Sequence, residues 1–226
     1  MTLRLAAGRA LAIMGPTGAG KSSLAALLAG ADEPGLAVVG GSAAVEGIPV
    51  RARGRKQRVR TYLTGYLSQG AGGELPARLT VGEVIGEPVT SRDRRVNERA
   101  LALRVAGLLD ELQLPLGAAA KYPYELSSGM RQRVALARAL VLNPRLFVGD
   151  DPYANLDLEV RKAARDALLR RRDEDGMAIV VVTNDAETVR DLDADVLVLR
   201  AGRPVGFGHG TADVLWTPDE GARIAS

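Results

Sequence analysis

The chain has 226 residues, of which 46% are hydrophobic and 25% charged, and this balance is typical of a globular protein with one large domain or a core with an inserted subdomain. It contains no cysteine and a single histidine, His209, which argues against disulfides, thiolate metal sites and histidine-based metal sites. The net charge is +3 and no stretch approaches the ~18 apolar residues of a membrane span, so we expect the chain itself to stay in the cytosol.

The first predicted elements lead into a glycine-rich loop. From Leu3 to Met14 the pattern predicts a short strand, a turn at Gly8 and Arg9, and a second, buried strand. An apolar helix follows from Leu24 onward. A strand, a glycine-rich loop and a helix are the context of a phosphate-binding loop. The loop is Gly15-Pro16-Thr17-Gly18-Ala19-Gly20-Lys21-Ser22-Ser23.

Each residue type in this loop has a physical role toward phosphate. Gly15, Gly18 and Gly20 allow a positive φ and a close approach, so that backbone N–H groups and the helix N-terminus surround phosphate oxygens. Lys21 would reach the β- and γ-phosphates, and the hydroxyl of Ser22 would ligate Mg²⁺. Only four of the 30 basic residues are lysines, so a lysine at this position argues against an ordinary glycine-rich turn.

The next segment predicts short strands and a basic run. Ala37 to Val39 and Ala43 to Val45 lie among glycines, which predicts short antiparallel strands at a sheet edge. The run from Arg51 to Arg60 carries six basic residues and no aromatic, which favours a solvated loop or hairpin over a nucleic-acid site. Tyr66 to Gln69 predicts a strand that ends in a polar residue, and Gly70 to Pro76 marks a boundary.

Beyond this boundary the pattern becomes helical. A short helix is predicted from Val81 to Ile85, ending before Pro88, and an irregular connector from Leu114 to Tyr124. A long helix is predicted over residues 94–112, with one apolar face made of Val96, Ala100, Leu103, Gly107 or Leu108, and Leu112.

Another helix is predicted to open at Ser127-Ser128-Gly129 and to continue until Pro144. Its N-terminus, capped by a hydroxyl, is either an ordinary cap or an anion site.

The last third alternates between strands and helices. This alternation predicts a parallel sheet with flanking helices. The predicted strands are Leu146 to Gly149, Ala178 to Val182 and Val196 to Leu199; the predicted helices are Leu158 to Arg172 and Ala186 to Leu192; and Arg203 to His209 closes the sheet by a hairpin or bend.

Together these motifs resemble the ATP-binding subunits of ABC transporters over nearly the whole chain. The phosphate loop alone would fit many nucleotide-hydrolysing families, and the ordered set makes the resemblance specific. Tyr122-Pro123, Met130 and Gly208-His209-Gly210-Thr211 look most like the dipeptide, oligopeptide and nickel importer branch. The ordered set is Gln69, Leu126-Ser127-Ser128-Gly129-Met130 with Arg131-Gln132-Arg133, Asp150-Asp151-Pro152, Ala154-Asn155-Leu156-Asp157 and Thr183-Asn184-Asp185.

The resemblance implies an α/β fold of the P-loop NTPase type. Its sheet is expected to be mostly parallel, with an antiparallel β edge and an inserted helical subdomain. The whole chain, 1–226, would be a single ATP-binding domain. Residues 1–69 and 144–226 would form the nucleotide-binding core, and residues 70–143 the helical subdomain with the signature Leu126 to Met130.

The resemblance also implies the cofactors and the site residues. ATP would be held by the phosphate loop, and Mg²⁺ by Ser22, Gln69 and Asp150. Asp151, Asn184 and Gln69 would act on the attacking water and the phosphate. Ser127, Ser128 and Gly129 would face the γ-phosphate held by a second, opposed subunit, so that a dimer is required for activity.

The sequence departs from the family pattern in four places. Asp151 stands where the family usually has a glutamate, and Asn184 stands at the place of the switch histidine. In the signature, Ser128 replaces a glycine and Met130 the common glutamine; no aromatic residue precedes Tyr62. Our hypothesis is that the chain binds MgATP, hydrolyses it slowly at its own site and works best in a heterodimer.

The expected function is energy coupling for a membrane transporter, with an importer of peptides, nickel or metal chelates favoured. The expected partners are transmembrane permease subunits and a second ATP-binding subunit, with no nucleic acid, at the cytoplasmic face of the cell membrane as a peripheral protein. Two alternatives stay open: a nucleotide-gated regulatory or structural subunit with little hydrolysis, and an ABC-type ATPase that is soluble and does not act in transport.

Overall fold

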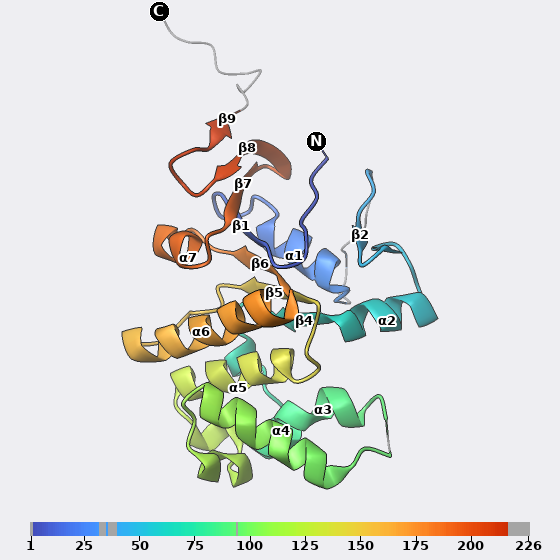
Figure 1. The fold of residues 1–226 in the computed structure, drawn as a ribbon, viewed down its shortest axis with the longest axis vertical. Helices are drawn as coiled ribbons and strands as arrows, with labels where there is room; N and C mark the ends of the chain where they lie inside the picture. Colours follow the sequence, from blue (N-terminus) through green and yellow to red (C-terminus); the bar gives the residue numbers. More distant parts are fainter. Residues whose placement is uncertain (1, 32–34, 36–39, 94, 217–226) are drawn as a thin grey trace, which may run out of the picture.

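The computed structural model describes residues 2–31, 35, 40–93 and 95–216, with the side chain of residue 216 outside the description. A seven-stranded sheet forms its centre, in the order β4-β5-β6-β1-β7-β8-β9 (Figure 1). The first five strands in this order are parallel, and β8 and β9 add antiparallel partners at one edge. The predicted mostly parallel sheet with an antiparallel edge is therefore confirmed. The strands are β1 (Ala10–Met14), β4 (Thr64–Leu67), β5 (Leu146–Asp150), β6 (Ala178–Val182), β7 (Asp195–Arg200), β8 (Arg203–His209) and β9 (Leu215–Trp216).

Both faces of the parallel strands are covered by helices. Alternate side chains of a strand point to opposite faces, so each strand contributes to two cores. On one face Leu11 and Ile13 of β1 pack toward α1 (Lys21–Ala29) with Val180 and Val182 of β6. The opposite face belongs to a larger core with α6 (Leu158–Asp175) and α7 (Ala186–Asp191) (Figure 1). The near-continuous apolar runs in these strands follow from burial on both faces.

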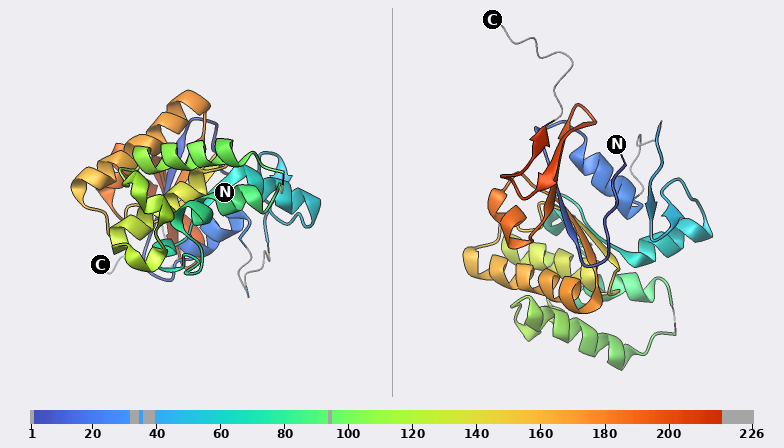
Figure 2. Two further views of the ribbon diagram at one scale, coloured as in Figure 1. Left: turned by 90° about the horizontal axis from the view of Figure 1, so that it is seen from below. Right: turned by 45° about the horizontal axis from the view of Figure 1, so that its top comes forward.

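Three longer helices lie together at the end of the molecule away from β8 and β9 (Figures 1 and 2). They are α3 (Val81–Thr90), α4 (Glu98–Glu111) and α5 (Ser128–Leu140). Short 3₁₀ helices lie beside them in the chain: η1 (Ala71–Gly73) comes before α3, and η2 (Leu116–Ala120) and η3 (Pro123–Glu125) come between α4 and α5. The helix α5 packs against both η1 and α3, which ties this group to the loop after β4.

The segments around the phosphate loop differ from the prediction in two places. Residues 2–6 form no strand, because they pair with no other strand in the described structure. The strands β2 (Ala44–Val45) and β3 (Ile48–Pro49) form a separate two-stranded sheet and are not at the edge of the main sheet. The predicted strand at Ala37 to Val39 lies outside the described residues.

From Arg55 onward the basic run forms a helix, α2 (Arg55–Leu63), where a loop or hairpin was predicted. Arginine, lysine and glutamine are good helix formers, and α2 contains neither glycine nor proline. Arg60 is only 3% exposed, and its guanidinium donates to the carbonyl oxygen of Pro49 at 3.4 Å. One of the six basic side chains is therefore part of the packed structure.

Two helix predictions in the second quarter were wrong. Pro88 lies inside α3, which continues to Thr90. A proline removes only one helical hydrogen bond, and the burial of Val81, Val84 and Ile85 keeps the helix in place despite that loss. The buried face of α4 is formed by Val105, Leu108 and Leu109, whereas Leu103 is 68% exposed. The predicted face was right at Leu108 and Leu112, which are 4% and 0% exposed, and wrong at Leu103, because alanines dilute the apolar pattern of this helix.

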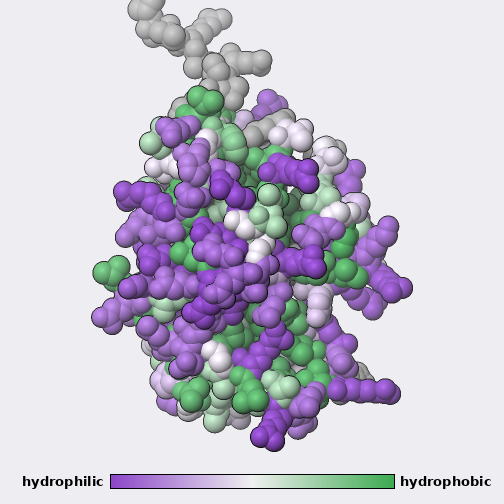
Figure 3. Space-filling view, in the orientation of Figure 1, coloured by the Kyte–Doolittle hydropathy of each residue, from purple (hydrophilic) through white to green (hydrophobic). Residues whose placement is uncertain are grey.

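The hydropathy of the molecular surface differs from one group of helices to another. Figure 3 shows hydrophilic side chains gathered over α6, and hydrophobic side chains reaching the surface near α3 and α4. No helix among the described residues is both long enough and apolar enough to cross a membrane.

Candidate functional site

The phosphate loop connects β1 to α1 in a backbone conformation that requires glycine. Gly15, Gly18 and Gly20 have φ values of 139°, 78° and 90°. A Cβ atom on Gly15 would lie 2.1 Å from the carbonyl oxygen of Leu199, on the adjacent strand β7. Gly15 is therefore fixed both by its dihedral angle and by the close approach of β7.

The side chain of Lys21 lies against the start of this loop. Its ammonium donates hydrogen bonds to the carbonyl oxygens of Gly15, at 2.8 Å, and Pro16, at 3.0 Å. Lys21 is also the first residue of α1, where free N–H groups and the helix dipole favour an anion. The loop therefore combines a cationic side chain with the positive end of a helix.

The far side of the loop is anchored by the turn between β7 and β8. Ala19 is 2% exposed, and its carbonyl oxygen accepts a hydrogen bond from the N–H of Gly202 at 3.0 Å. The N–H of Ala19 donates to the carbonyl oxygen of Pro16 at 3.2 Å, which closes the turn inside the loop. These contacts hold the loop in one shape before any ligand binds.

The structure brings the loop together with polar residues from the ends of three other strands. Thr17 to Ser23 line a cavity of about 330 Å³ with Gln69, which follows β4, and with Asp150 and Asp151 at the end of β5. Val182, Thr183 and Asn184 at the end of β6 complete the lining. The carboxyl ends of parallel strands meet at one edge of a sheet, which is where ligands bind in open α/β folds.

Asp150 is buried without a complete set of partners. Asp150 is 3% exposed, and its Oδ2 atom has no hydrogen-bond partner in the described structure. A buried carboxylate oxygen without a donor is costly unless a cation satisfies it. The hydroxyl of Ser22 and the amide of Gln69 line the same cavity, so the donor set consists of oxygen ligands of the kind that Mg²⁺ prefers.

Asp151 stands directly beside this carboxylate. Burial, and then the negative charge of Asp150, raises the pKa of Asp151 above its usual range, while Lys21 and the hydroxyl of Thr183 act in the opposite direction. Its φ is 47°, in the left-handed region, and its N–H donates to the carbonyl oxygen of Val182 at 3.0 Å. The backbone of Asp151 is thus fixed between β5 and β6.

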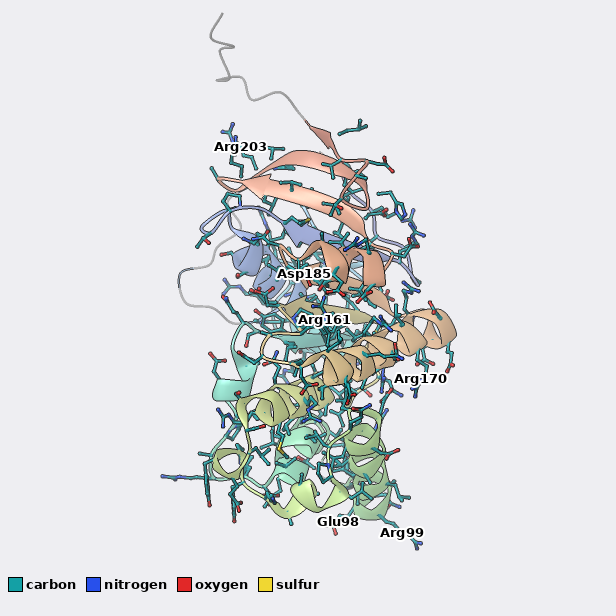
Figure 4. All side chains as sticks on the ribbon, turned by 90° about the vertical axis from the view of Figure 1, so that its left-hand side faces the viewer. Glu98, Arg99, Arg161, Arg170, Asp185 and Arg203 are labelled. Carbon is teal, nitrogen blue, oxygen red and sulfur yellow. The ribbon has the colours of Figure 1, made fainter. Side chains whose placement is uncertain are left out.

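A polar network behind the cavity was not predicted in full. The hydroxyl of Thr183 accepts a hydrogen bond from the N–H of Asp185 at 3.1 Å, and Asp185 caps α7 through the N–H groups of Glu187 and Thr188. Asp185 also forms an ion pair with Arg161 of α6 (Figure 4). The motif Thr183-Asn184-Asp185 marked one end of this network, but nothing in the sequence indicated Arg161, because its partner lies 24 residues away.

The signature residues lie apart from the cavity. Ser127 caps α5, since its hydroxyl accepts a hydrogen bond from the N–H of Met130 at 3.2 Å, and Ser128 is the first residue of the helix. Ser127 and Ser128 are exposed, and a Cβ atom on Gly129 would lie 3.0 Å from the carbonyl oxygen of Asn155. Neither serine nor Gly129 lines the cavity of the phosphate loop. Within one chain, the structure does not bring the signature to the loop.

Comparisons with known proteins agree on one family. A family model described as "ABC transporter" matches residues 1–154. Solved structures of the ATP-binding cassette MJ0796, described as dimeric and in one case as bound to ADP and Pi, have a TM-score of 0.82 with 27% sequence identity, covering 92% of this chain and 88% of that chain.

Curated relatives are import ATP-binding proteins for different substrates. The Fe(3+) ions import ATP-binding protein FbpC of Pseudomonas fluorescens is 35% identical over 92% of this chain, and the chain spans 56% of its length. The sulfate/thiosulfate import ATP-binding protein CysA of Burkholderia mallei is 34% identical over 94% of this chain and 58% of its own length. The nickel import ATP-binding protein NikE of Brucella abortus is 32% identical over 91% of this chain and 76% of its own length.

Proposed function

The chain belongs to the ABC transporter family as an ATP-binding domain, and from this premise we propose that it binds and hydrolyses ATP to power import through a membrane permease. The observation that carries the proposal is the shared cavity of the phosphate loop, Asp150 and Asp151. A cationic loop at a helix N-terminus, opposite two carboxylates, is suited to a nucleotide triphosphate and a divalent cation.

In this proposal the phosphate loop binds the nucleotide. Residues Gly15 to Ser23 surround the phosphates with backbone N–H groups, and Lys21 exchanges its contacts with Gly15 and Pro16 for phosphate oxygens. Ser22, Asp150 and Gln69 would hold Mg²⁺, which supplies charge neutralisation for the phosphates when bound. The partnerless Oδ2 of Asp150 supports this assignment.

Hydrolysis requires a positioned water and electrostatic stabilisation of the phosphate charges, with little covalent chemistry from the protein. We assign the orientation of that water to Asp151, with Gln69 at the mouth of the cavity. Asn184 would reach a phosphate oxygen through its amide, which donates a hydrogen bond but carries no positive charge. Thr183 supports Asp151 from behind through its hydroxyl.

The site built on this loop is proposed to be slow. The carboxylate of Asp151 is one methylene shorter than that of a glutamate, and a displacement of about 1 Å costs on the order of 100-fold in rate. Burial beside Asp150 also raises the pKa of Asp151, which disfavours its charged form. These two features support a second candidate function, a nucleotide-gated subunit that closes on ATP and hydrolyses little.

A second ATP-binding subunit is proposed as the first partner. Ser127, Ser128 and Gly129 are not part of the chain's own cavity, yet they form a hydroxyl-capped helix N-terminus suited to phosphate. They would complete the site of an opposed subunit, and that subunit's signature would complete this one. The dimeric MJ0796 structures support this arrangement, and a competent partner in a heterodimer would compensate for the slow site.

Permease subunits are proposed as the second partner, which would hold the chain at the cytoplasmic face of the membrane. A groove of about 650 Å³ runs between α2, α3 and α5, at the division that we propose between the core (1–69 and 144–226) and the helical subdomain (70–143). Val59 and Tyr62 are exposed in it, at 43% and 46%. Arg138 in this groove is already paired with Glu87, at 2.9 Å. Arg55, Arg58 and Arg92 also line the groove, so it fits a short permease segment that carries apolar and acidic side chains.

The substrate class that we propose is nickel, a metal chelate or a peptide. The nickel relative and the residues Tyr122-Pro123 and Gly208 to Thr211 support this class. Relatives that import Fe(3+) ions or sulfate have similar identity, so the permease and not this chain is expected to set the substrate.

The decisive experiment is steady-state ATP hydrolysis by the purified chain, alone and with each candidate partner subunit, next to a titration of MgATP binding. We expect binding without appreciable turnover until a partner is added. Lys21→Ala should abolish the binding. Rapid turnover by the chain alone, abolished in Lys21→Ala, would reject the slow site but keep the ATPase; no binding of MgATP would reject the proposed function.

A further inference from the structure

Two tyrosines form an exposed stack immediately before the signature. The rings of Tyr122 and Tyr124 have centroids 5.5 Å apart and planes that differ by 5°. Tyr124 is 69% exposed and Tyr122 is 36% exposed. They flank the buried Pro123, so both rings leave the same short turn toward solvent. A pair of parallel aromatic rings with a free face is a ready stacking partner for another planar group.

The turn that carries the pair is hydrogen-bonded at the start of the signature. The carboxylate of Glu125 accepts a hydrogen bond from the N–H of Tyr122 at 2.7 Å, and the N–H of Leu126 donates to the carbonyl oxygen of Pro123 at 3.2 Å. Leu126 is buried, and Ser127 follows it as the cap of α5. Ser127 is three positions after Tyr124, which limits the distance between their Cα atoms to about 10 Å. These contacts place the turn that carries the two rings next to the N-terminus of α5.

The phosphate cavity has no comparable platform. The residues that line it are small or polar, and none of those described is aromatic. In the sequence, no aromatic residue precedes Tyr62. Tyr62 is exposed but lies in the groove of α2 and α3, where the guanidinium of Arg92 stands 5.7 Å from its ring centroid. Within the part of the chain that the structure describes, the site thus accounts for phosphate binding but offers no ring on which a base could stack.

We propose that Tyr122 and Tyr124 form the stacking platform for the adenine of ATP held by the phosphate loop of the opposite subunit. The inference rests on the proposed function, since it requires the dimer in which α5 of one subunit faces the nucleotide of the other. With Ser127 at the γ-phosphate, the nearby stack lies on the same subunit within the reach of one nucleotide. Each base would then be held in trans, and nucleotide affinity would depend on dimer formation. Stacking on a tyrosine is tolerant of base identity, so adenine and guanine would both be accepted.

A fluorescent base tests the stacking directly. The probe is the triphosphate of 2-aminopurine riboside, whose emission falls when its base stacks on an aromatic ring. Two copies of the chain suffice, because each copy carries both a phosphate loop and the tyrosine pair. We expect quenching in the wild-type dimer, its loss in Tyr124→Ala, and its retention in Tyr124→Phe and in the control Tyr62→Ala. Base–aromatic stacking of the usual strength predicts an affinity about 5-fold to 100-fold lower for Tyr124→Ala.

Mixing variants tests whether the stacking occurs in trans. Lys21→Ala keeps the tyrosines but lacks a working loop, and Tyr124→Ala keeps the loop but lacks the outer ring. Neither alone should quench the probe, whereas their mixture should, because the loop of one meets the tyrosines of the other. Equal quenching in wild type and Tyr124→Ala would overturn the inference while ATP binding and dimer formation remain intact. Quenching by isolated monomers would overturn the trans arrangement, and failure of the wild type to bind ATP would overturn both proposals.

Discussion

The side-chain oxygen of Asn184 accepts a hydrogen bond from the backbone N–H of Gly15, with the two atoms 3.0 Å apart. This bond joins the end of β6 to the first residue of the phosphate loop, across 169 positions of the sequence. Because the amide oxygen is engaged, the amide NH₂ group is the part of Asn184 that is left for a phosphate. The residue at the switch position therefore also supports the loop.

Replacing Asn184 by alanine should loosen this loop. The N–H of Gly15 loses its acceptor, so we expect a loss of about 1 kcal/mol in unfolding free energy and weaker MgATP binding. The matched control is Gln69→Ala, since Gln69 is an exposed amide in the same cavity for which the described structure shows no hydrogen bond. Chemical denaturation and calorimetric titration measure both effects. Equal losses of stability in the two variants would contradict a supporting role for Asn184.

Two glycines of the loop should respond differently to alanine. In Gly15→Ala the new methyl group would meet the carbonyl oxygen of Leu199 at 2.1 Å at a φ of 139°, so the β7 strand must shift. Gly18 also has a positive φ, 78°, but nothing lies within 4 Å of its added Cβ. We expect Gly18→Ala to cost about 1–2 kcal/mol in stability and Gly15→Ala clearly more. Thermal unfolding of the two variants without nucleotide decides between steric conflict and backbone strain alone.

Neutralising Asp150 should stabilise the protein in the absence of metal. Its Oδ2 atom is buried without a partner beside the carboxylate of Asp151, so Asp150→Asn removes a desolvated charge and a repulsion. We expect a gain of about 1 kcal/mol in unfolding free energy without nucleotide. The same variant should lose the additional stabilisation that Mg²⁺ gives over ATP with EDTA. A destabilised variant that still responds to Mg²⁺ would show that Asp150 has a structural role instead.

The single histidine predicts a pH-dependent contribution to stability. His209 lies between Asp195, at 3.0 Å from Nδ1, and Asp193, at 3.2 Å from Nε2, with Arg9 also near Asp195. The hydrogen bond to Asp195, followed by the charge of Asp193, raises the pKa of His209, while Arg9 acts in the opposite direction. Because the folded-state pKa is raised, the contribution is fully present below the unfolded value of about 6.5 and is lost as the pH rises through the folded value.

The measurement is the melting temperature of wild type and His209→Gln between pH 5 and 9. The difference between them should be largest at the acidic end and should vanish at the alkaline end. Asp166→Asn, which changes a carboxylate paired with Arg165 on α6, is the control for a general effect of charge. A difference that grows with pH would contradict the assigned direction.

The phosphate loop and the mostly parallel sheet were predictable because they depend on local pattern. Gly15 to Ser23 follow a buried strand and open a helix, and the alternation after Leu146 leaves few topologies for a parallel sheet. The first strand was harder to predict. Residues 2–6 have the sequence pattern of a strand, but a strand forms only with a pairing partner, and the local sequence does not show which segments pair. In the same way, the helix α2 was missed because its run of basic residues was interpreted as a solvated loop or hairpin, although Arg60 is buried.

The site was predictable to the extent that its residues end strands. Asp150 ends β5, Asp151 follows it, and Asn184 lies two residues after the end of β6, so their convergence follows from the parallel sheet. The local sequence gives no sign of the roles of Arg161 and of the stacked tyrosines, because an ion pair between helices and a stack of rings depend on tertiary packing.

The last prediction concerns two of the four departures from the family pattern, those at Asp151 and Asn184. Asp151→Glu extends the carboxylate by one methylene toward the cavity, and Asn184→His restores a ring that is able to carry a positive charge at a phosphate. If both departures slow the site, the double variant should hydrolyse ATP at least 10-fold faster in the assembled complex. Each single variant should gain less, because it changes only one of the two positions that are proposed to slow the site.

Single-turnover hydrolysis in the complex measures this, with Lys21→Ala on the same chain to remove the contribution of its own loop. The gain should disappear in that background, since both substitutions lie on the cavity that Lys21 serves. If the double variant turns over no faster than wild type, Asp151 and Asn184 are sufficient as they stand, and the rate of this subunit is set elsewhere, at dimer closure or in the permease.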